Sequence, residues 1–265
     1  MKKSNKRPIA FSLVSTNHGS LLVNRHDYIL VENGGVGIGF QILHSSSFDQ
    51  EEVDIALQLL DSRKKNYGTG VVALDCGANI GAHTIEWAQF MHGWGEVLAF
   101  EAQERIFYAL AGNITMNNCF NARAIWAAVG SATGSIGVPV PDYFKPSSFG
   151  SLEIEKKDTT EFIGQEIDYS ENKTQQTHMV AIDDLNLQRL DFVKIDIEGM
   201  EMAALNGGIH SIGKFKPQMM IETIKSNELE IRTFLTNWDY RFFPLGLGIL
   251  AVHQSDPVLP EIAVT

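Results

Sequence analysis

A strand, a glycine-containing turn and a helix follow one another without a gap in the first third of the chain. Val71–Cys76 is an apolar run of the kind that forms a buried strand, with an acid, Asp75, near its end. Gly77 and Gly81 follow at once, and a helical pattern begins at His83. Glycine allows a sharp turn and a close approach of backbone to ligand, and a helix start offers free N–H groups and a positive dipole end. The succession predicts a βα unit of an α/β sheet with a ligand-binding turn.

The sequence downstream continues this alternation of short apolar strands and helical stretches. Such alternation is typical of a mainly parallel sheet covered by helices on both faces. We therefore predict an α/β fold with a doubly wound, mainly parallel, seven-stranded Rossmann-like sheet and an antiparallel C-terminal hairpin around Gly246 and Gly248. Further strands are expected at 97–100, 122–129, 136–140, 192–197 and 218–222, and helices at 48–65, 83–92, 105–116, 200–205 and 228–237.

The N-terminal segment has a different pattern. Residues 1–17 are expected to form a basic, frayed arm. Residues 21–43 are rich in β-forming residues and are broken by Asn33-Gly34-Gly35, a strong turn signal. Val36–Leu43 is expected to be the third strand of a small N-terminal β appendage.

These patterns divide the chain in two. Residues 1–47 are assigned to the arm and β appendage, and residues 48–265 to the α/β domain. Within the domain, residues 141–177 are polar and have few apolar anchors. Because long irregular segments inside such domains are often functional or mobile, we interpret 141–177 as a variable insert that can close over the site as a lid.

Composition and charge narrow the classes of partner. A net charge of −11 argues against nucleic-acid binding, which usually needs a Lys/Arg-rich face. Cys76 and Cys119 lack metal-ligand spacing and are expected to be reduced thiols. No apolar run approaches the ~20 residues that span a bilayer, and Ile9–Val14 is too short for a signal sequence. We expect a cytoplasmic protein whose β appendage can pair with a second copy.

Two acids at strand ends predict the kind of ligand. Asp75 can accept a hydrogen bond from an ammonium group, while the following helix start suits a carboxylate, so an amino-acid moiety fits better than a pyrophosphate. Glu101 closes the next strand 20 residues beyond Gly81, where an acid can hold the ribose hydroxyls of an adenosine. A nicotinamide-dependent oxidoreductase is an alternative, but Asn79 stands where its fingerprint has the middle glycine.

The motifs together resemble the FkbM family of S-adenosylmethionine-dependent methyltransferases, over roughly residues 70–223. The resemblance implies S-adenosylmethionine as the cofactor and transfer of its methyl group, commonly to a hydroxyl of a small molecule, sugar or glycan. The family usually has proline where Ala102 stands. The motifs that carry the resemblance are Leu74–Gly81, Ala99–Ala102, Asn113, Asn117-Asn118, Ala128–Gly130, Asp183–Leu185, Phe192–Glu201, Pro217 and Glu222. The residues assigned to the cofactor are Asp75, Gly77, Ala78, Asn79, Gly81, Glu101, Ala102 and Ala128.

Three further acids are candidates for the acceptor side. We interpret Asp196, supported by Glu198 or Glu222, as the group that orients or deprotonates the acceptor. Equally, Asp196 can contact the cofactor while Glu198 caps the next helix and Glu222 holds a loop. The three acids can also hold a divalent cation, although no metal is expected. Lys194 is interpreted as their charge partner.

Two histidines and one wider alternative complete the hypotheses. His83, in the helix that follows the glycine turn, can reach the cofactor pocket or simply lie on the helix surface, and His178 is an equally weighted candidate for an acceptor-side base. A module that binds S-adenosylmethionine without catalysis is the second alternative to the methyltransferase.

Overall fold

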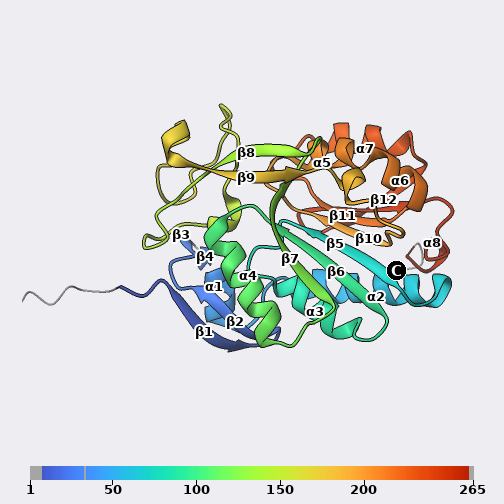
Figure 1. The fold of residues 1–265 in the computed structure, drawn as a ribbon, viewed down its shortest axis with the longest axis horizontal. Helices are drawn as coiled ribbons and strands as arrows, with labels where there is room; N and C mark the ends of the chain where they lie inside the picture. The colour runs from blue at the N-terminus through green and yellow to red at the C-terminus, as the bar shows by residue number, and fades with distance from the viewer. Residues whose placement is uncertain (1–7, 33, 263–265) are drawn as a thin grey trace, which may run out of the picture.

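A nine-stranded, mixed sheet forms the centre of the computed structural model, which describes residues 8–32 and 34–262. The strand order is β12-β13-β11-β10-β5-β6-β7-β9-β8 (Figure 1). The six strands from β11 to β9 run parallel, and the pairs β11–β13, β12–β13 and β8–β9 are antiparallel. The strands of this sheet are β5 (Val71–Cys76), β6 (Gly95–Glu101), β7 (Ala122–Val129), β8 (Gly134–Pro139), β9 (Thr174–Val180), β10 (Phe192–Ile195), β11 (Gln218–Glu222), β12 (Tyr240–Leu245) and β13 (Gly248–His253).

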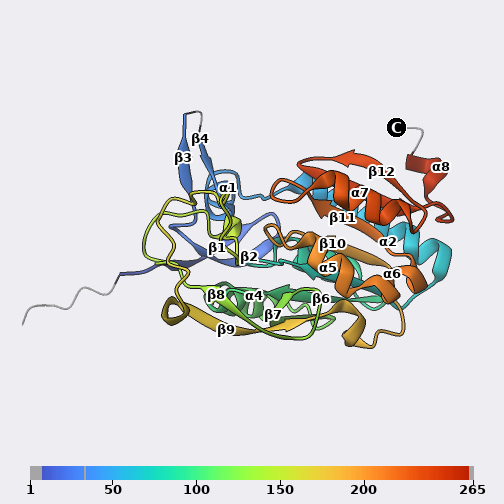
Figure 2. The ribbon, with the colours of Figure 1, turned by 90° about the horizontal axis from the view of Figure 1, so that it is seen from above.

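Helices cover both faces of the sheet, as predicted for a doubly wound fold (Figures 1 and 2). Val71 and Ala73 of β5 pack with α2, α3 and α4, while Leu74 and Cys76 of the same strand pack with α5, α6 and α7. Because neighbouring side chains of a strand point to opposite faces, one apolar run serves both cores. The helices are α1 (Ile38–Ser45), α2 (Gln50–Tyr67), α3 (Ala82–Phe90), α4 (Glu104–Met116), α5 (Glu201–Gly207), α6 (Ile209–Phe215), α7 (Glu228–Thr236) and α8 (Leu259–Ile262).

The prediction of seven strands was wrong, because β8 and β9 extend the sheet beyond β7. The strand expected at 136–140 is β8, whereas β9 begins at Thr174, inside the segment interpreted as an irregular insert. Its sequence, Thr-Gln-Gln-Thr-His-Met-Val, is mostly polar and has no apolar alternation. The C-terminal antiparallel pair, β12 and β13, is present as predicted.

Two small β ladders precede the domain. β1 (Phe11–Thr16) pairs with β2 (Gly19–Asn24), and β3 (Ile29–Val31) pairs with β4 (Gly34–Val36). The expectation of a frayed arm through residue 17 was wrong for β1, and residues 1–7 lie outside the described part of the chain. β2 lies beside α4, where the Asn113 side chain accepts a hydrogen bond from the Leu22 N–H at 2.6 Å.

The third strand expected at Val36–Leu43 is instead helix α1. Gly39 explains the difference, since a Cβ atom there would lie 2.5 Å from the carbonyl oxygen of Asn24. The Asp27 carboxylate accepts a hydrogen bond from the Gly39 N–H at 3.2 Å, and the Asp27 carbonyl accepts one from the Phe40 N–H at 2.9 Å. The glycines therefore serve a close approach of a helix start to the Asp27 loop.

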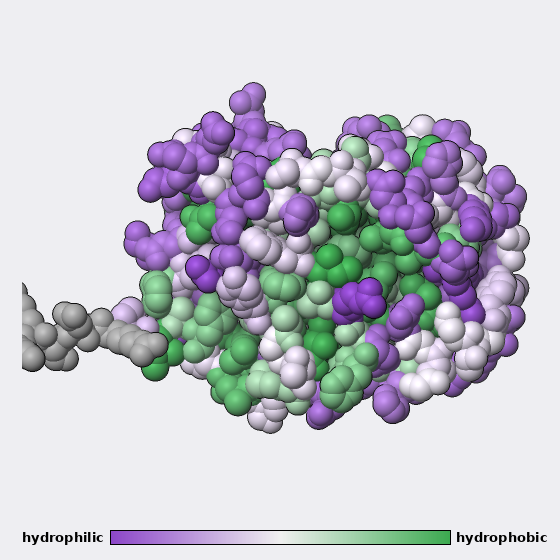
Figure 3. Space-filling view, in the orientation of Figure 1, coloured by the Kyte–Doolittle hydropathy of each residue, from purple (hydrophilic) through white to green (hydrophobic). Residues whose placement is uncertain are grey.

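Within residues 8–32 and 34–262, no helix combines the length and apolar character needed to cross a bilayer. Figure 3 shows hydrophilic side chains over the segment after β8 and over α5–α7, with more hydrophobic residues between them.

Candidate functional site

The central strands end level with one another at the edge of one cavity. The cavity has a volume of about 400 Å³ and is lined by residues from β5, β6, β7 and the ends of β10 and β11. Four paired residues lie side by side on the neighbouring strands β5, β6, β10 and β11: Cys76, Phe100, Ile195 and Ile221. The next residue on each strand is Gly77, Glu101, Asp196 or Glu222, and all four line the cavity.

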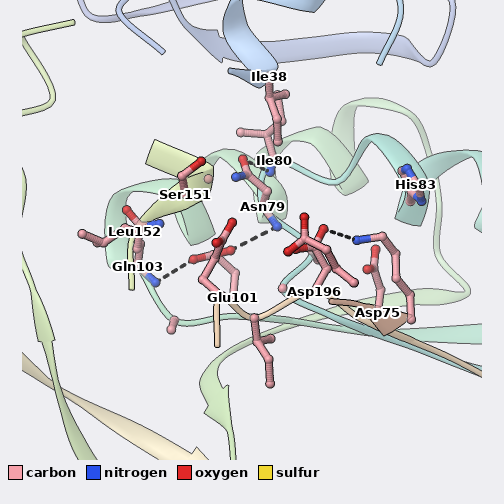
Figure 4. Close-up of a pocket in the computed structure, with 18 of the residues that line it drawn as sticks. Ile38, Asp75, Asn79, Ile80, His83, Glu101, Gln103, Ser151, Leu152 and Asp196 are labelled. Carbon is pink, nitrogen blue, oxygen red and sulfur yellow. Dashed lines mark hydrogen bonds and ion pairs between the residues drawn. The ribbon is translucent and has the colours of Figure 1, made fainter. Parts of the chain in front are cut away.

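Glu101 is held firmly at the end of β6. One carboxylate oxygen accepts a hydrogen bond from the Gln103 N–H at 2.7 Å, and the other accepts one from the Asn79 N–H at 3.0 Å (Figure 4). Burial raises the pKa of Glu101 to about 7, against the lowering effect of these backbone donors. Each oxygen retains acceptor capacity, so the carboxylate can bind two hydroxyl groups of a ligand.

Asp75 lies on the cavity wall but is already engaged. It is buried, its carboxylate accepts a hydrogen bond from the Thr84 hydroxyl at 2.6 Å, and burial raises its pKa. The nearby Lys194 ammonium is 2.6 Å from a carboxylate oxygen of Asp196, as expected of a charge partner. Asp75 therefore lines the cavity while its carboxylate is already held by a hydrogen bond from Thr84 and lies near the Lys194 charge.

Gly77 and Gly81, the two glycines of the turn after β5, have different structural roles. A Cβ atom on Gly77, whose φ is +84°, would lie 1.8 Å from the Asp196 carbonyl oxygen. Gly77 thus permits the turn after β5 to touch the turn after β10. Gly81, with φ of +90°, starts α3 and faces Leu110 instead of the cavity.

Asp196, Glu198 and Glu222 come together as predicted for one acidic group. One carboxylate oxygen from each lies within 4.8 Å of the others. Burial, followed by the charge of Asp196, raises the pKa of Glu198 to about 7 and that of Glu222 well above its usual range. A carboxyl with a pKa near neutrality, as in Glu198, is suited to exchange a proton with a bound ligand.

Glu198 does not cap the next helix. Its carboxylate lies 2.9 Å from the Lys225 ammonium. Glu201 accepts the hydrogen bonds from the N–H groups of Ile197 and Gly199 instead, at 3.1 and 3.2 Å. Glu198 is therefore available to the cavity, which it lines.

Two walls of the cavity come from segments with no recognisable motif. Gly37 and Ile38 belong to the N-terminal segment, and Ser148 and residues 150–152 belong to the segment after β8. The Asp27 carboxylate joins these walls, because it accepts hydrogen bonds from the Phe149 N–H at 3.0 Å and from the Gly39 N–H. Gln103, also missed, donates to the Phe149 carbonyl at 2.8 Å.

The structure brings together all of the predicted site residues except Gly81 and His178. Gly81 lies outside the cavity lining, and so does His178, an exposed residue of β9. His83 does line the cavity. The predicted residues on its wall are Asp75, Gly77, Ala78, Asn79, Glu101, Ala102, Ala128, Asp196, Glu198 and Glu222.

A second cavity of about 360 Å³ shares a wall with the first. It lies between the start of α2 and the turn from β12 to β13, and Asp49, Lys194, Asp196 and Glu222 line both cavities. The acidic group thus stands where the two spaces meet.

The comparisons with known proteins agree with this geometry. The family model described as a methyltransferase FkbM domain matches residues 75–242, more than half of the chain. A curated relative, Methyltransferase 1 of Beauveria bassiana, is 24% identical over 194 residues, which cover 68% of this chain and 72% of that protein.

Solved structures with a similar arrangement are more distant. The methyltransferase FkbM structure from Methylobacillus flagellatus matches with a TM-score of 0.48 and 20% identity, covering 70% of this chain and 43% of that one. This chain thus spans less than half the length of that protein. The fibrillarin of Aeropyrum pernix, solved with S-adenosyl-L-methionine, matches with a TM-score of 0.41 and 10% identity over 94% of this chain and 96% of its own. From the family match, the chain belongs to the methyltransferase FkbM domain family.

Proposed function

We propose that the chain is an S-adenosylmethionine-dependent methyltransferase that methylates a hydroxyl oxygen of a small molecule, sugar or glycan. The observation that carries the proposal is the convergence of the strand ends on one cavity. Glu101, fixed by two backbone donors, stands at one end, and the acids Asp196, Glu198 and Glu222 stand at the other. One ligand that spans this cavity would meet a hydroxyl-binding carboxylate and a proton acceptor.

The residues present fit this cofactor. A cavity of about 400 Å³ lies in the range that holds a ligand of this size. Glu101 retains acceptor capacity for the ribose hydroxyls, and Ala102, Ala128 and Gln103 offer walls for the base. Asp75 and the start of α3, where Ala82 lines the cavity, are assigned to the amino-acid moiety.

The protein's contribution to the reaction is positioning and proton transfer. When bound, the cofactor would supply an electrophilic methyl group on a sulfonium, which the acceptor oxygen attacks in line with the departing sulfur. Asp196, fixed by Lys194 at 2.6 Å, orients the acceptor hydroxyl. Glu198 takes its proton, since a pKa of about 7 leaves this carboxyl partly ionised near neutral pH, and Glu222, whose pKa burial raises to about 9, supports it as a protonated carboxyl. A positioned base of this kind contributes about 10²–10⁴-fold.

The acceptor is assigned to the second cavity and to the walls made by the N-terminal segment and the segment 141–177. Lys225 supports the lid interpretation of this segment, because its ammonium donates to the Ser151 carbonyl at 2.6 Å and lies 2.9 Å from Glu198. Movement of this segment would therefore shift Lys225 and change its ion pair with Glu198. We keep the predictions that the acceptor is not a nucleic acid and that the chain acts in the cytoplasm.

Isothermal titration with S-adenosylhomocysteine and with NAD tests the cofactor. We expect S-adenosylhomocysteine to bind and NAD not to bind; the reverse would make the chain a nicotinamide-dependent enzyme. Methyl transfer to a panel of hydroxylated sugars and lipids tests the reaction. Asp196→Asn should abolish turnover and leave S-adenosylhomocysteine affinity within about threefold, so unchanged turnover would refute the role of Asp196.

A further inference from the structure

A second group of potential ligands lies beside the cofactor cavity, on helices α2 and α3. Asp49 immediately precedes α2, Glu52 lies in its first turn, and His83 is the second residue of α3. One ring nitrogen of His83 and one carboxylate oxygen of each acid lie within 4.8 Å of one another. Because α2 and α3 pack together, the rigid elements of the fold hold these atoms in place.

His83 is the unusual member of this group. It is only 4% exposed, and among the described residues neither of its ring nitrogens has a hydrogen-bond partner. A buried polar group without a partner is costly and calls for an explanation such as an ion. Packing fixes the ring, whose centroid lies 5.7 Å from that of Trp87 and 6.2 Å from that of Phe48 (Figure 4 shows His83 beyond Asp75).

The charges around this group favour a cation. Both ring nitrogens of His83 lack a partner among the described residues and one lies within reach of the two acids, so the imidazole is free to act as a ligand. The four nearby carboxylates Asp49, Glu52, Asp75 and Asp196 face the single ammonium of Lys194, which Asp196 holds at 2.6 Å. When these carboxylates are ionised they outnumber the Lys194 ammonium, so the space favours a cation.

We propose that Asp49, Glu52 and His83 bind a divalent transition-metal ion of the Zn²⁺ or Mn²⁺ type. One imidazole nitrogen and two carboxylate oxygens suit such ions better than Mg²⁺ or Ca²⁺, which prefer oxygen ligands alone. Three protein ligands leave at least one position open, as in catalytic sites. The open position borders both cavities, since Asp49 lines each of them.

The role of the ion rests on the proposed methyltransferase function. A hydroxyl bound to a divalent cation loses its proton more readily. The ion would bind the acceptor oxygen in this position, and the proton would pass to the carboxyls of the acidic group. Metal binding itself does not depend on that role.

The test uses the full chain after dialysis against EDTA. Zn²⁺ is titrated calorimetrically, and the visible spectrum of added Co²⁺ reports nitrogen and oxygen coordination. Asp49→Asn, Glu52→Gln and His83→Gln should each weaken Zn²⁺ binding at least tenfold. Asp54→Asn on α2 and His92→Gln after α3, both exposed and outside the two cavities, are the matched controls and should change it less than twofold.

The site would be overturned if the folded wild-type protein did not bind Zn²⁺ or if the controls lost Zn²⁺ binding equally. It would also be overturned if Glu198→Gln, a further variant in the acidic group, lost Zn²⁺ binding while the three ligand variants kept it. If His83→Gln does not fold, the two carboxylate variants decide. S-Adenosylhomocysteine binding is measured on the same samples: its retention without Zn²⁺ binding removes the metal site and leaves the proposed function intact. Loss of S-adenosylhomocysteine binding in His83→Gln with no effect on metal would assign His83 to the cofactor and refute the proposal.

Discussion

Glu101→Gln perturbs the proposed cofactor site at a single group. In the wild type both carboxylate oxygens accept a backbone N–H, at 2.7 Å from Gln103 and at 3.0 Å from Asn79. A glutamine amide has one acceptor oxygen, so one buried donor loses its partner, at a cost of about 1–3 kcal/mol to the protein. Two ribose hydroxyls would also exchange a charged acceptor for neutral groups, a loss of about 1–2 kcal/mol each.

The weaker hydrogen bonds to the two ribose hydroxyls reduce ligand affinity. A total of about 3 kcal/mol corresponds to about a hundredfold increase in Kd. The assay is isothermal titration with S-adenosylhomocysteine at pH 8, because burial raises the pKa of Glu101 to about 7 and the carboxylate must be ionised. Wild-type affinity should then fall as the pH decreases below 7, whereas the affinity of the variant should not follow this titration.

A matched control lies on the same strand. Glu96 is exposed near the start of β6, away from the cavity, and Glu96→Gln should leave Kd within about twofold of the wild type. Thermal unfolding of both variants separates a loss of fold from a loss of binding. Wild-type affinity in a folded Glu101→Gln variant would refute the assignment of Glu101 to the ribose.

Three further predictions follow from the structure. Gly77→Ala should lower the free energy of unfolding by about 3 kcal/mol or more in a denaturant titration, because a Cβ atom would meet the Asp196 carbonyl at 1.8 Å. Gly93→Ala, with a φ of +77° but nothing within 4 Å, should lose only about 1 kcal/mol. Methyl transfer should decrease as the pH falls below the Glu198 pKa of about 7, since the protonated carboxyl cannot act as a base; a rate that is flat from pH 6 to 8 would exclude it. Burial raises the pKa of Asp27 from 3.8 to about 6, so the folded chain binds more protons in this range, and its free energy of unfolding should fall by up to about 3 kcal/mol as pH rises from about 4 to 6. Asp27→Asn should lack that component in denaturant titrations across this range.

The central sheet was predictable because its strands are buried on both faces. Runs such as Val71–Cys76 stay apolar throughout, and one run contributes to both hydrophobic cores. The site residues followed from the same fact, since acids at the ends of parallel strands must meet at one edge. Glu101, Asp196 and Glu222 confirm this expectation, each one residue beyond a shared register row.

The elements that the sequence did not predict depend on partners far away in the chain. β9 is polar because most of its side chains are exposed or half-buried, so it has no apolar pattern, and its place in the sheet comes from backbone pairing with β7 and β8. Helix α1 resembled a strand because its glycines are required by contact with Asn24 and Asp27, not by a turn. Local propensity cannot reveal such contacts.

Some residues that line the cavity lie inside the family match and others lie outside it, so the match does not describe the whole cavity. The match begins at residue 75 and therefore includes Glu101 and the acidic group, but it excludes Gly37, Ile38 and Phe48, which line the same cavity. Through the Asp27 carboxylate, the N-terminal wall is hydrogen-bonded to Phe149, which lies in the segment that forms the neighbouring wall. A change of acceptor that reshapes one wall must preserve or replace this link, because an unpaired N–H in a buried position costs about 1–3 kcal/mol. Under the proposed function, we expect acceptor choice to depend jointly on the N-terminal segment and the segment after β8, and exchanging either one alone between relatives should impair folding before it alters specificity.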